Sequence, residues 1–320
     1  MSDTLHICGL KVERGQKLRT YLPVLDTKTE IPVTIINGQN DGPTLLITAG
    51  IHGGEYPGIA AAMELGRDIS PEDIRGCLIL MHPVNIQSFW ARRAFVIPED
   101  GRNLNREFPG DVNGTLSQKT AYLLSQFFFP LADFYVDMHS GDIHEELHPY
   151  VYYPGLPNEE ISEKSREIAK ILDMKFMVKS MATSGAYNYA AISGVPSILI
   201  ERGGAGFCLR EDIDAYKADI HNILRKLGLC SDPIQPRKHN PSDVSNVIYL
   251  ENETSGCWFP NFRSGELVKK GDELGHLTDL FGTLIKKYIS EQDGVVLYHC
   301  PALAAPQGTR LVTYGKFAAE

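Results

Sequence analysis

The chain has 320 residues, with 31 Lys and Arg against 40 Asp and Glu, so its formal net charge is −9. Apolar residues make up 43% and charged residues 22%, which is ordinary globular usage and excludes an intrinsically disordered chain. The negative charge argues against nucleic acid or an anionic membrane surface as the main partner. The length suffices for one large domain, or for a main domain with a smaller one.

The N-terminal residues show no basic region followed by an apolar stretch, and no apolar run approaches the roughly 20 residues that span a bilayer. The six cysteines are scattered and form no C-x-x-C pair, which is not a disulfide framework. We therefore expect a reduced, cytoplasmic protein without a membrane partner. A homo-oligomer is compatible with this sequence.

Short apolar runs and helical patterns alternate along the first 230 residues. Residues 4–38 have the alternation and turns of hairpins. Buried strands are predicted at 45–47, 77–81, 134–138, 175–178 and 198–200, and helices after Pro57, at 117–129 with Ser117 as cap, at 157–171 and at 211–226. This order predicts an α/β fold with a mixed or largely parallel sheet covered by helices on both faces.

The pattern changes after Leu229. Residues 231–242 contain three prolines among polar residues and are predicted to be a linker. Residues 243–320 hold short strand-like runs separated by glycines, as in 265–271. We expect a main domain over 1–230 and a small all-β module over 243–320.

Two short motifs have metal-ligand character. His52 and Glu55 lie in a glycine-rich turn directly after a buried strand, and His139 follows another buried strand. Open α/β sheets bind ligands at the carboxyl ends of their strands, so these side chains are predicted to meet in one crevice. Two His and one Glu with an open position are a zinc set of hydrolases. Asp137, two residues before His139, is positioned to accept a proton from its imidazole. Either motif alone recurs by chance, since a lone His near a strand end is usually satisfied by hydrogen bonds.

The polar run 100–110 is a candidate substrate anchor. Its Asn105 and Arg106 place an amide beside a guanidinium, which together match a carboxylate. Upstream, Arg92 and Arg93 follow Trp90, and one of them is a candidate for polarising a scissile carbonyl. The alternative interpretations are a solvated loop for the first pair and a charged helix end for the second.

Glu201 ends a buried apolar strand and is the acid/base candidate. Desolvation raises the pKa of such a carboxyl toward a value useful for proton transfer. The alternative is a structural ion pair of Glu201 with Arg202 or another arginine. With a metal site nearby, catalysis is the better interpretation.

Four ordered motifs resemble a known family. They are the His52-Gly-Gly-Glu55 turn, the Asn103-Leu-Asn-Arg106 run, Asp137-Met-His139, and the strand that ends at Glu201. The sequence resembles the M14 metallocarboxypeptidase-like superfamily, specifically its succinylglutamate desuccinylase/aspartoacylase family, over nearly the whole chain. Residues 256–260 and 265–275 also look like a biotinyl/lipoyl-type barrel-sandwich module, which part of that family carries.

The resemblance implies a zinc-carboxypeptidase-like fold and one Zn²⁺ per chain, bound by His52, Glu55 and His139. It implies that Asn105 and Arg106 hold a substrate carboxylate and that Glu201 is the general base. The carbonyl-polarising arginine falls on Arg92 or Arg93. Of these we prefer Arg93, with Arg92 then expected among the substrate-binding residues.

The predicted function is zinc-dependent hydrolysis of the amide bond of a small N-acyl amino acid or N-acyl amine. A carboxypeptidase acting on peptides or cell-wall fragments would use the same residues. A non-catalytic binding protein that retains the fold is a third hypothesis, and a lipoyl- or biotin-type carrier is a fourth. The β module is predicted to narrow the entrance and exclude large peptides.

Overall fold

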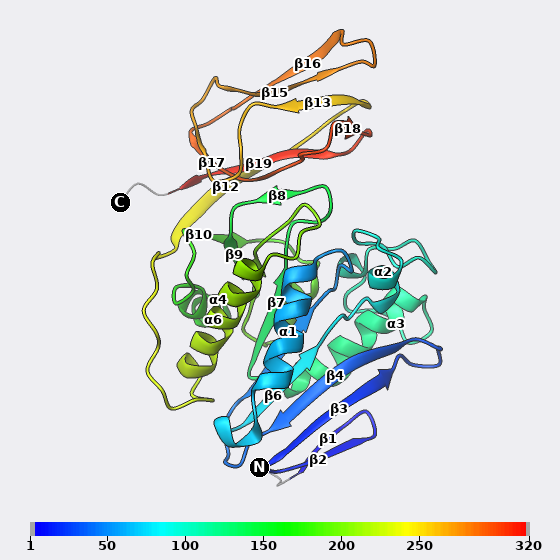
Figure 1. Cartoon of the computed structure of the whole chain (residues 1–320), viewed down its shortest axis with the longest axis vertical. Coiled ribbons are helices and arrows are strands. Elements are labelled where there is room, and N and C mark those ends of the chain that lie inside the picture. The colour runs from blue at the N-terminus through cyan, green and yellow to red at the C-terminus, as the bar shows by residue number, and fades with distance from the viewer. Residues whose placement is uncertain (1–3, 318–320) are drawn as a thin grey trace.

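One large mixed sheet runs through the molecule. The computed structural model describes residues 4–317, and 13 of their strands form this sheet (Figure 1). In sheet order they are β14 (Leu267–Val268), β17 (Gly294–His299), β19 (Arg310–Phe317), β12 (Ser242–Glu251), β10 (Phe176–Ser180), β9 (Tyr150–Pro154), β11 (Ser197–Glu201), β7 (Phe134–His139), β5 (Thr44–Ala49), β6 (Cys77–Met81), β4 (Glu30–Asn37) and β3 (Gln16–Pro23), with β8 (Glu146–Leu147) beside β17.

The centre of the sheet is parallel. β5 and β11 each pair in parallel with β7, so the carboxyl ends of all three strands meet at one edge. β6 and β7 are buried along their whole length, as expected for strands covered on both faces. β6 is an unbroken apolar run, and β7 carries the buried Asp137 within its apolar run.

Helices cover both faces of this centre. One core cluster packs under α1 (Tyr56–Asp68), α4 (Glu159–Ala169) and α6 (Arg210–Lys226). A second lies under α3 (Leu116–Leu123), α5 (Ala186–Ile192) and the hairpin of β1 (Thr4–Ile7) and β2 (Leu10–Glu13). In α6 the buried residues Ile213, Tyr216, Ile220 and Ile223 recur every three or four positions, which is one face of a helix. The predicted α/β class is therefore confirmed.

Some local predictions were wrong or incomplete. The helix predicted from Ser117 begins at Leu116, because Thr115 is its N-cap residue and donates its backbone N–H to the Gln118 side-chain oxygen at 3.1 Å. The Ser117 hydroxyl instead donates to Asp100. β9, α5 and the short α2 (Ile86–Trp90) were not predicted, because each is too short for a clear periodicity.

The C-terminal part is all-β, as predicted. A four-stranded sheet of β16 (Leu284–Ile289), β15 (Glu273–Thr278), β13 (Gly256–Pro260) and β18 (Ala304–Ala305) covers its own core around Trp258 (Figure 1). β12 pairs in parallel with β10 and so joins this part to the main sheet. The domain division at 231–242 stays a prediction. Within 4–317, no helix has the length and apolar character that crossing a membrane requires.

Candidate active site

The predicted metal ligands and the acid/base candidate lie at or directly after the carboxyl ends of three strands. His52 and Glu55 lie in the turn between β5 and α1, and His139 and Glu201 are the last residues of β7 and β11. The β7–β11 register sets Glu201 beside His139. Gly53 lets the turn pack closely, because a Cβ atom there would lie 2.3 Å from the backbone nitrogen of Phe89.

His52, Glu55 and His139 converge on one point. Their ligand atoms all lie within 4.8 Å of one another. Nδ1 of His52 is 2.6 Å from one Glu55 oxygen, and Nδ1 of His139 is 2.9 Å from the other. Glu55 and His139 are buried, with 3% and 2% of their surface exposed, whereas His52 is half-buried and all three line one cavity.

The outer nitrogens of both rings face oxygen acceptors. Nε2 of His52 is hydrogen-bonded to the Asn103 side-chain oxygen at 3.1 Å. Nε2 of His139 lies 3.0 Å from Asp137 Oδ2, and the role predicted for Asp137, to accept the imidazole proton, stays a prediction. The two Nδ1 atoms therefore lie against the two oxygens of the Glu55 carboxylate. Two imidazole nitrogens and a carboxylate are a ligand set that zinc takes in hydrolases once the rings are neutral. These residues therefore fit a divalent metal.

The electrostatics agree with a cation-binding centre. Burial raises the pKa of Glu55, but the His139 and His52 rings outweigh it and bring that pKa down to about 2. Burial lowers the pKa of His139, but the carboxylates of Asp137 and Glu55 outweigh it and hold that pKa well above its usual value. Both shifts show a site that stabilises positive charge next to Glu55.

Glu201 lies beside this centre and is in no ion pair with a Lys or Arg side chain of residues 4–317. Burial raises its pKa well above the usual value, and the Glu55 and Glu145 carboxylates raise it further against the opposing effect of the His139 ring. Its Oε2 atom is buried and has no hydrogen-bond partner among the described residues. The alternative ion pair with Arg202 is not formed, because Arg202 Nη2 lies 2.6 Å from Asp219 Oδ2. A buried carboxyl group with a free oxygen atom can accept a proton from one group and donate it to another.

Asn105 and Arg106 line the same cavity. They lie in a short 3₁₀ turn (Leu104–Arg106) that the Asn103 side chain caps. The Asn105 side-chain oxygen accepts the Ala186 backbone N–H at 2.8 Å, so its NH₂ group is the donor it can offer to a ligand. An amide donor and a guanidinium on one wall suit a carboxylate.

Arg92 and Arg93 lie outside this cavity. Both follow α2 in an exposed loop, and neither lines the cavity, although their neighbour Phe95 does. The Gly54 backbone N–H donates to the Ala94 carbonyl at 3.1 Å, which holds the loop against the His52 turn. The role of either arginine stays a prediction.

The cavity has a volume of about 470 Å³ and contains groups that sequence reasoning missed. They come from the loop after β7, from β9, from α5 and from the C-terminal strands, which are brought together only by the fold. They are Asp142, Glu145, Tyr150, Tyr152, Tyr187, Asn188, Tyr249, Tyr298 and Arg310. The aromatic alternation of 150–153 is the one sequence signal for them.

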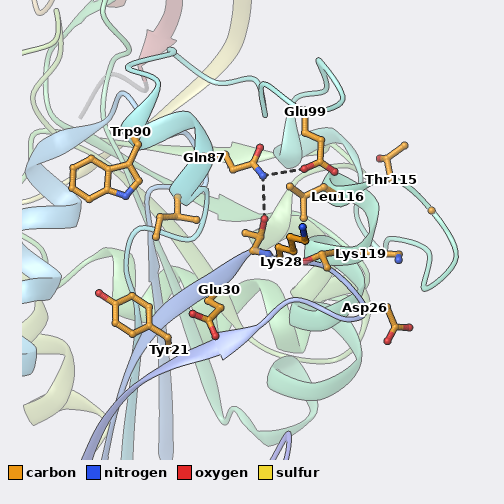
Figure 2. Close-up of a pocket in the computed structure, with 14 residues that line it drawn as sticks. Tyr21, Asp26, Lys28, Glu30, Gln87, Trp90, Glu99, Thr115, Leu116 and Lys119 are labelled. Atoms are coloured by element: carbon orange, nitrogen blue, oxygen red, sulfur yellow. Dashed lines mark hydrogen bonds between the residues drawn. The ribbon is translucent and has the colours of Figure 1, made fainter.

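A larger hollow of about 720 Å³ lies elsewhere, between α2 and the β3–β4 turn. Figure 2 shows the Gln87 amide donating to Glu99 there, with Trp90 and Tyr21 at another side. It holds none of His52, Glu55 and His139 and is wide open to solvent. The chemistry therefore belongs to the smaller cavity.

Known proteins resemble this chain in sequence and structure. Residues 41–227 match the model of the succinylglutamate desuccinylase/aspartoacylase catalytic domain. The chain is 29% identical over 276 residues to an N-alpha-acetyl-L-2,4-diaminobutyric acid deacetylase of Halomonas elongata, covering 83% of this chain and 80% of that protein.

Solved structures agree along almost the whole chain. A succinylglutamate desuccinylase/aspartoacylase from Rhodobacter sphaeroides superposes with a TM-score of 0.86 at 26% identity, covering 96% of this chain and 97% of that one. The product-bound ectoine utilization protein EutE (DoeB) from Ruegeria pomeroyi gives a TM-score of 0.86 at 26% identity, covering 95% and 97%. The shared fold includes the C-terminal β part.

Proposed function

Because the chain belongs to the succinylglutamate desuccinylase/aspartoacylase family, we propose that it is a zinc-dependent deacylase that hydrolyses the amide bond of an N-acyl amino acid or small N-acyl amine. The observation that carries this proposal is the convergence of His52, Glu55 and His139 beside the buried carboxyl group of Glu201. The named activity of the Halomonas elongata relative, removal of an acetyl group from an amino acid nitrogen, supports this substrate class.

His52, Glu55 and His139 would hold the zinc ion. When bound, zinc supplies Lewis acidity for the scissile carbonyl and for the attacking water. The outer contacts of the rings with Asn103 and Asp137 keep both imidazoles oriented for this task.

Glu201 moves the proton. It takes a proton from water as the oxygen attacks the carbonyl carbon, and it gives that proton to the nitrogen as the C–N bond breaks. Its place at the end of β11, in register with His139, sets the carboxyl group beside the metal ligands for both proton transfers. Arg93 is proposed to stabilise the developing oxyanion, with its loop moving toward the cavity, and Arg92 to contact the substrate.

Asn105 and Arg106 orient the substrate. The guanidinium and the amide NH₂ hold the carboxylate of the N-acyl amino acid, and this fixes the acyl group relative to Glu201. Tyr249, Tyr298 and Arg310 from the C-terminal part line the same cavity, which supports the prediction that this part narrows the entrance.

A deacylation screen tests the proposal. The zinc-loaded protein is assayed for amine release from N-acetyl and N-succinyl amino acids, N-acyl amines and short peptides, and its metal content is measured by elemental analysis. We expect one zinc per chain and turnover of N-acyl amino acids. Turnover of peptides alone would favour a carboxypeptidase, and an inactive protein without metal would favour a binding protein.

A further inference from the structure

Three fully buried polar side chains, Tyr135, Thr48 and Asp137, form a hydrogen-bonded chain in the core behind His139, which we call the polar column. The Thr48 hydroxyl donates to Asp137 Oδ1 at 2.7 Å and lies 2.5 Å from the Tyr135 hydroxyl. A threonine hydroxyl has one proton, and Asp137 receives it, so the Tyr135 hydroxyl is the donor to Thr48. Burial raises the pKa of Tyr135 well above its usual value, so the phenol keeps the proton that it donates.

The pairing of two central strands builds this column. In the parallel pairing of β5 with β7, Thr48 stands opposite Asp137. Tyr135 and Asp137 are two residues apart on β7 and therefore point to the same face of the sheet, as does His139 two residues further on. This face packs in the second core cluster, where the Tyr135 ring lies 5.0 Å from the Phe129 ring. The column thus leads through the core to a ligand of the proposed metal site.

The column ends at the outer nitrogen of His139. Asp137 Oδ2 lies 3.0 Å from His139 Nε2, while Oδ1 of the same carboxylate accepts the Thr48 hydroxyl. A carboxylate is planar, so the hydrogen bond that fixes Oδ1 also fixes the direction of Oδ2. On the opposite side of the imidazole ring, Nδ1 lies 2.9 Å from Glu55. The orientation of this ring at the metal site therefore depends on how the Asp137 carboxylate is held.

Core packing alone does not require these hydroxyl groups. The neighbouring positions on this face are filled by apolar side chains, such as Leu46 on β5 and Leu199, which stands opposite Asp137 on β11. A hydroxyl group in an apolar core is costly unless it is hydrogen-bonded, and a valine fills the same space as a threonine without that cost. The feature that the two hydroxyl groups share is their hydrogen-bonded connection to Asp137.

We propose that Thr48 and Tyr135 are positioning residues of the metal site, which hold the Asp137 carboxylate and through it orient the His139 imidazole toward the metal. Neither Thr48 nor Tyr135 lines the active-site cavity, so neither touches the substrate. The inference rests on the proposed zinc site and extends it into the core. Loss of the Thr48 hydroxyl frees the carboxylate to rotate away from His139, and zinc is then bound more weakly.

Two substitutions of Thr48 separate positioning from packing. Thr48→Val keeps the shape and removes the hydroxyl, whereas Thr48→Ser keeps the hydroxyl and removes a methyl group. We expect the zinc Kd, measured by competition with a chromogenic chelator, to rise on the order of tenfold in Thr48→Val and to stay near the unmodified value in Thr48→Ser. A packing role predicts the reverse order, because the lost methyl group leaves a cavity.

The absorption spectrum of the Co²⁺-loaded protein reports the ligand geometry directly. We expect this spectrum to change in Thr48→Val and to be restored in Thr48→Ser. An unchanged zinc Kd together with an unchanged Co²⁺ spectrum in Thr48→Val overturns the inference. A rise of the zinc Kd in Thr48→Ser as large as in Thr48→Val overturns it as well.

A double variant tests whether Tyr135 acts through Thr48. Tyr135→Phe should raise the zinc Kd less than Thr48→Val does, and the double variant should bind zinc no more weakly than Thr48→Val alone. Additive losses would contradict the polar column. Thr120→Val is the matched control, since the buried Thr120 hydroxyl donates to the Leu116 carbonyl within α3 at 2.8 Å. Its zinc Kd should equal that of the unmodified protein.

A measurement without metal distinguishes this inference from the proposed function. If the unmodified protein binds no zinc, the zinc proposal fails, and the ring-nitrogen NMR signals of His139 in the metal-free protein decide about the column. Signals that move in Thr48→Val, but not in Thr48→Ser or Thr120→Val, support the inference. Identical signals in all of these proteins overturn it. If Thr48→Val does not fold, Tyr135→Phe takes its place in each comparison.

Discussion

Glu201 illustrates how a single side chain is prepared for proton transfer by its place in the fold. It ends β11 in register with His139, and one of its oxygens is buried without a hydrogen-bond partner among the described residues. We predict that Glu201→Gln lowers kcat by roughly 10²–10⁴-fold, because the amide has the same shape but cannot shuttle a proton. Elemental analysis should still find zinc in the variant. Activity near that of the unmodified protein would refute the role of Glu201.

Arg92 and Arg93 differ in their predicted roles although both are exposed and adjacent. We predict that Arg93→Ala lowers kcat by about 10²–10³-fold through loss of oxyanion stabilisation. Arg92→Ala is the matched control and should mainly change KM, since Arg92 is proposed to contact substrate. Steady-state kinetics of both variants decide the assignment, and the reverse pattern would assign the polarising role to Arg92.

At the scale of elements, α6 ties together the strand ends that carry the site. The Tyr216 hydroxyl of α6 donates to the backbone carbonyls of His139 and Ile200, which are close to the ends of β7 and β11. Asp219 of the same helix holds Arg202 in a buried ion pair and accepts the Asp173 backbone N–H. The positions of His139 and Glu201 therefore depend on a helix that contributes no residue to the cavity lining.

The Arg202–Asp219 pair should contribute strongly to stability. We predict that Asp219→Ala lowers the free energy of unfolding by about 3–5 kcal/mol, because it leaves Arg202 charged, buried and unpaired. Urea denaturation measures this loss. Glu160→Gln, which breaks the exposed pair with Lys164, is the control, with an expected loss of about 0.5 kcal/mol or less. Equal losses in the two variants would contradict the prediction.

At the scale of the whole molecule, a metal that binds only the folded state raises its stability. We predict that saturating zinc raises the Tm of the chelated protein, because the three ligands come together only when β5 and β7 are paired. His52→Ala should lose both the metal and the activity, and its Tm should not respond to zinc. A similar Tm increase in both proteins would place the bound zinc elsewhere.

The C-terminal part is continuous with the main sheet, which determines how its role can be tested. β12 pairs with β10, so truncation at residue 242 would expose a sheet edge and remove Tyr249, Tyr298 and Arg310 together. The single substitution Tyr249→Ala disturbs the sheet less than this truncation does. We predict that it lets the enzyme accept bulkier acyl groups, because the Tyr249 hydroxyl lies 3.3 Å from that of Tyr152 across the cavity lining. An unchanged acyl-length profile would contradict the narrowing role.

The sequence alone determined the α/β class, most strands of the central sheet and the set of His52, Glu55 and His139. These follow from local patterns: an apolar run predicts a buried strand, and polar residues directly after such runs meet at one sheet edge. Asp142, Glu145, Asn188 and the C-terminal wall of the cavity were decided only by the tertiary structure. They come from short loops and elements far apart in the chain, and whether an acceptor such as Asn188 Oδ1 is buried without a partner depends on packing that no local pattern encodes.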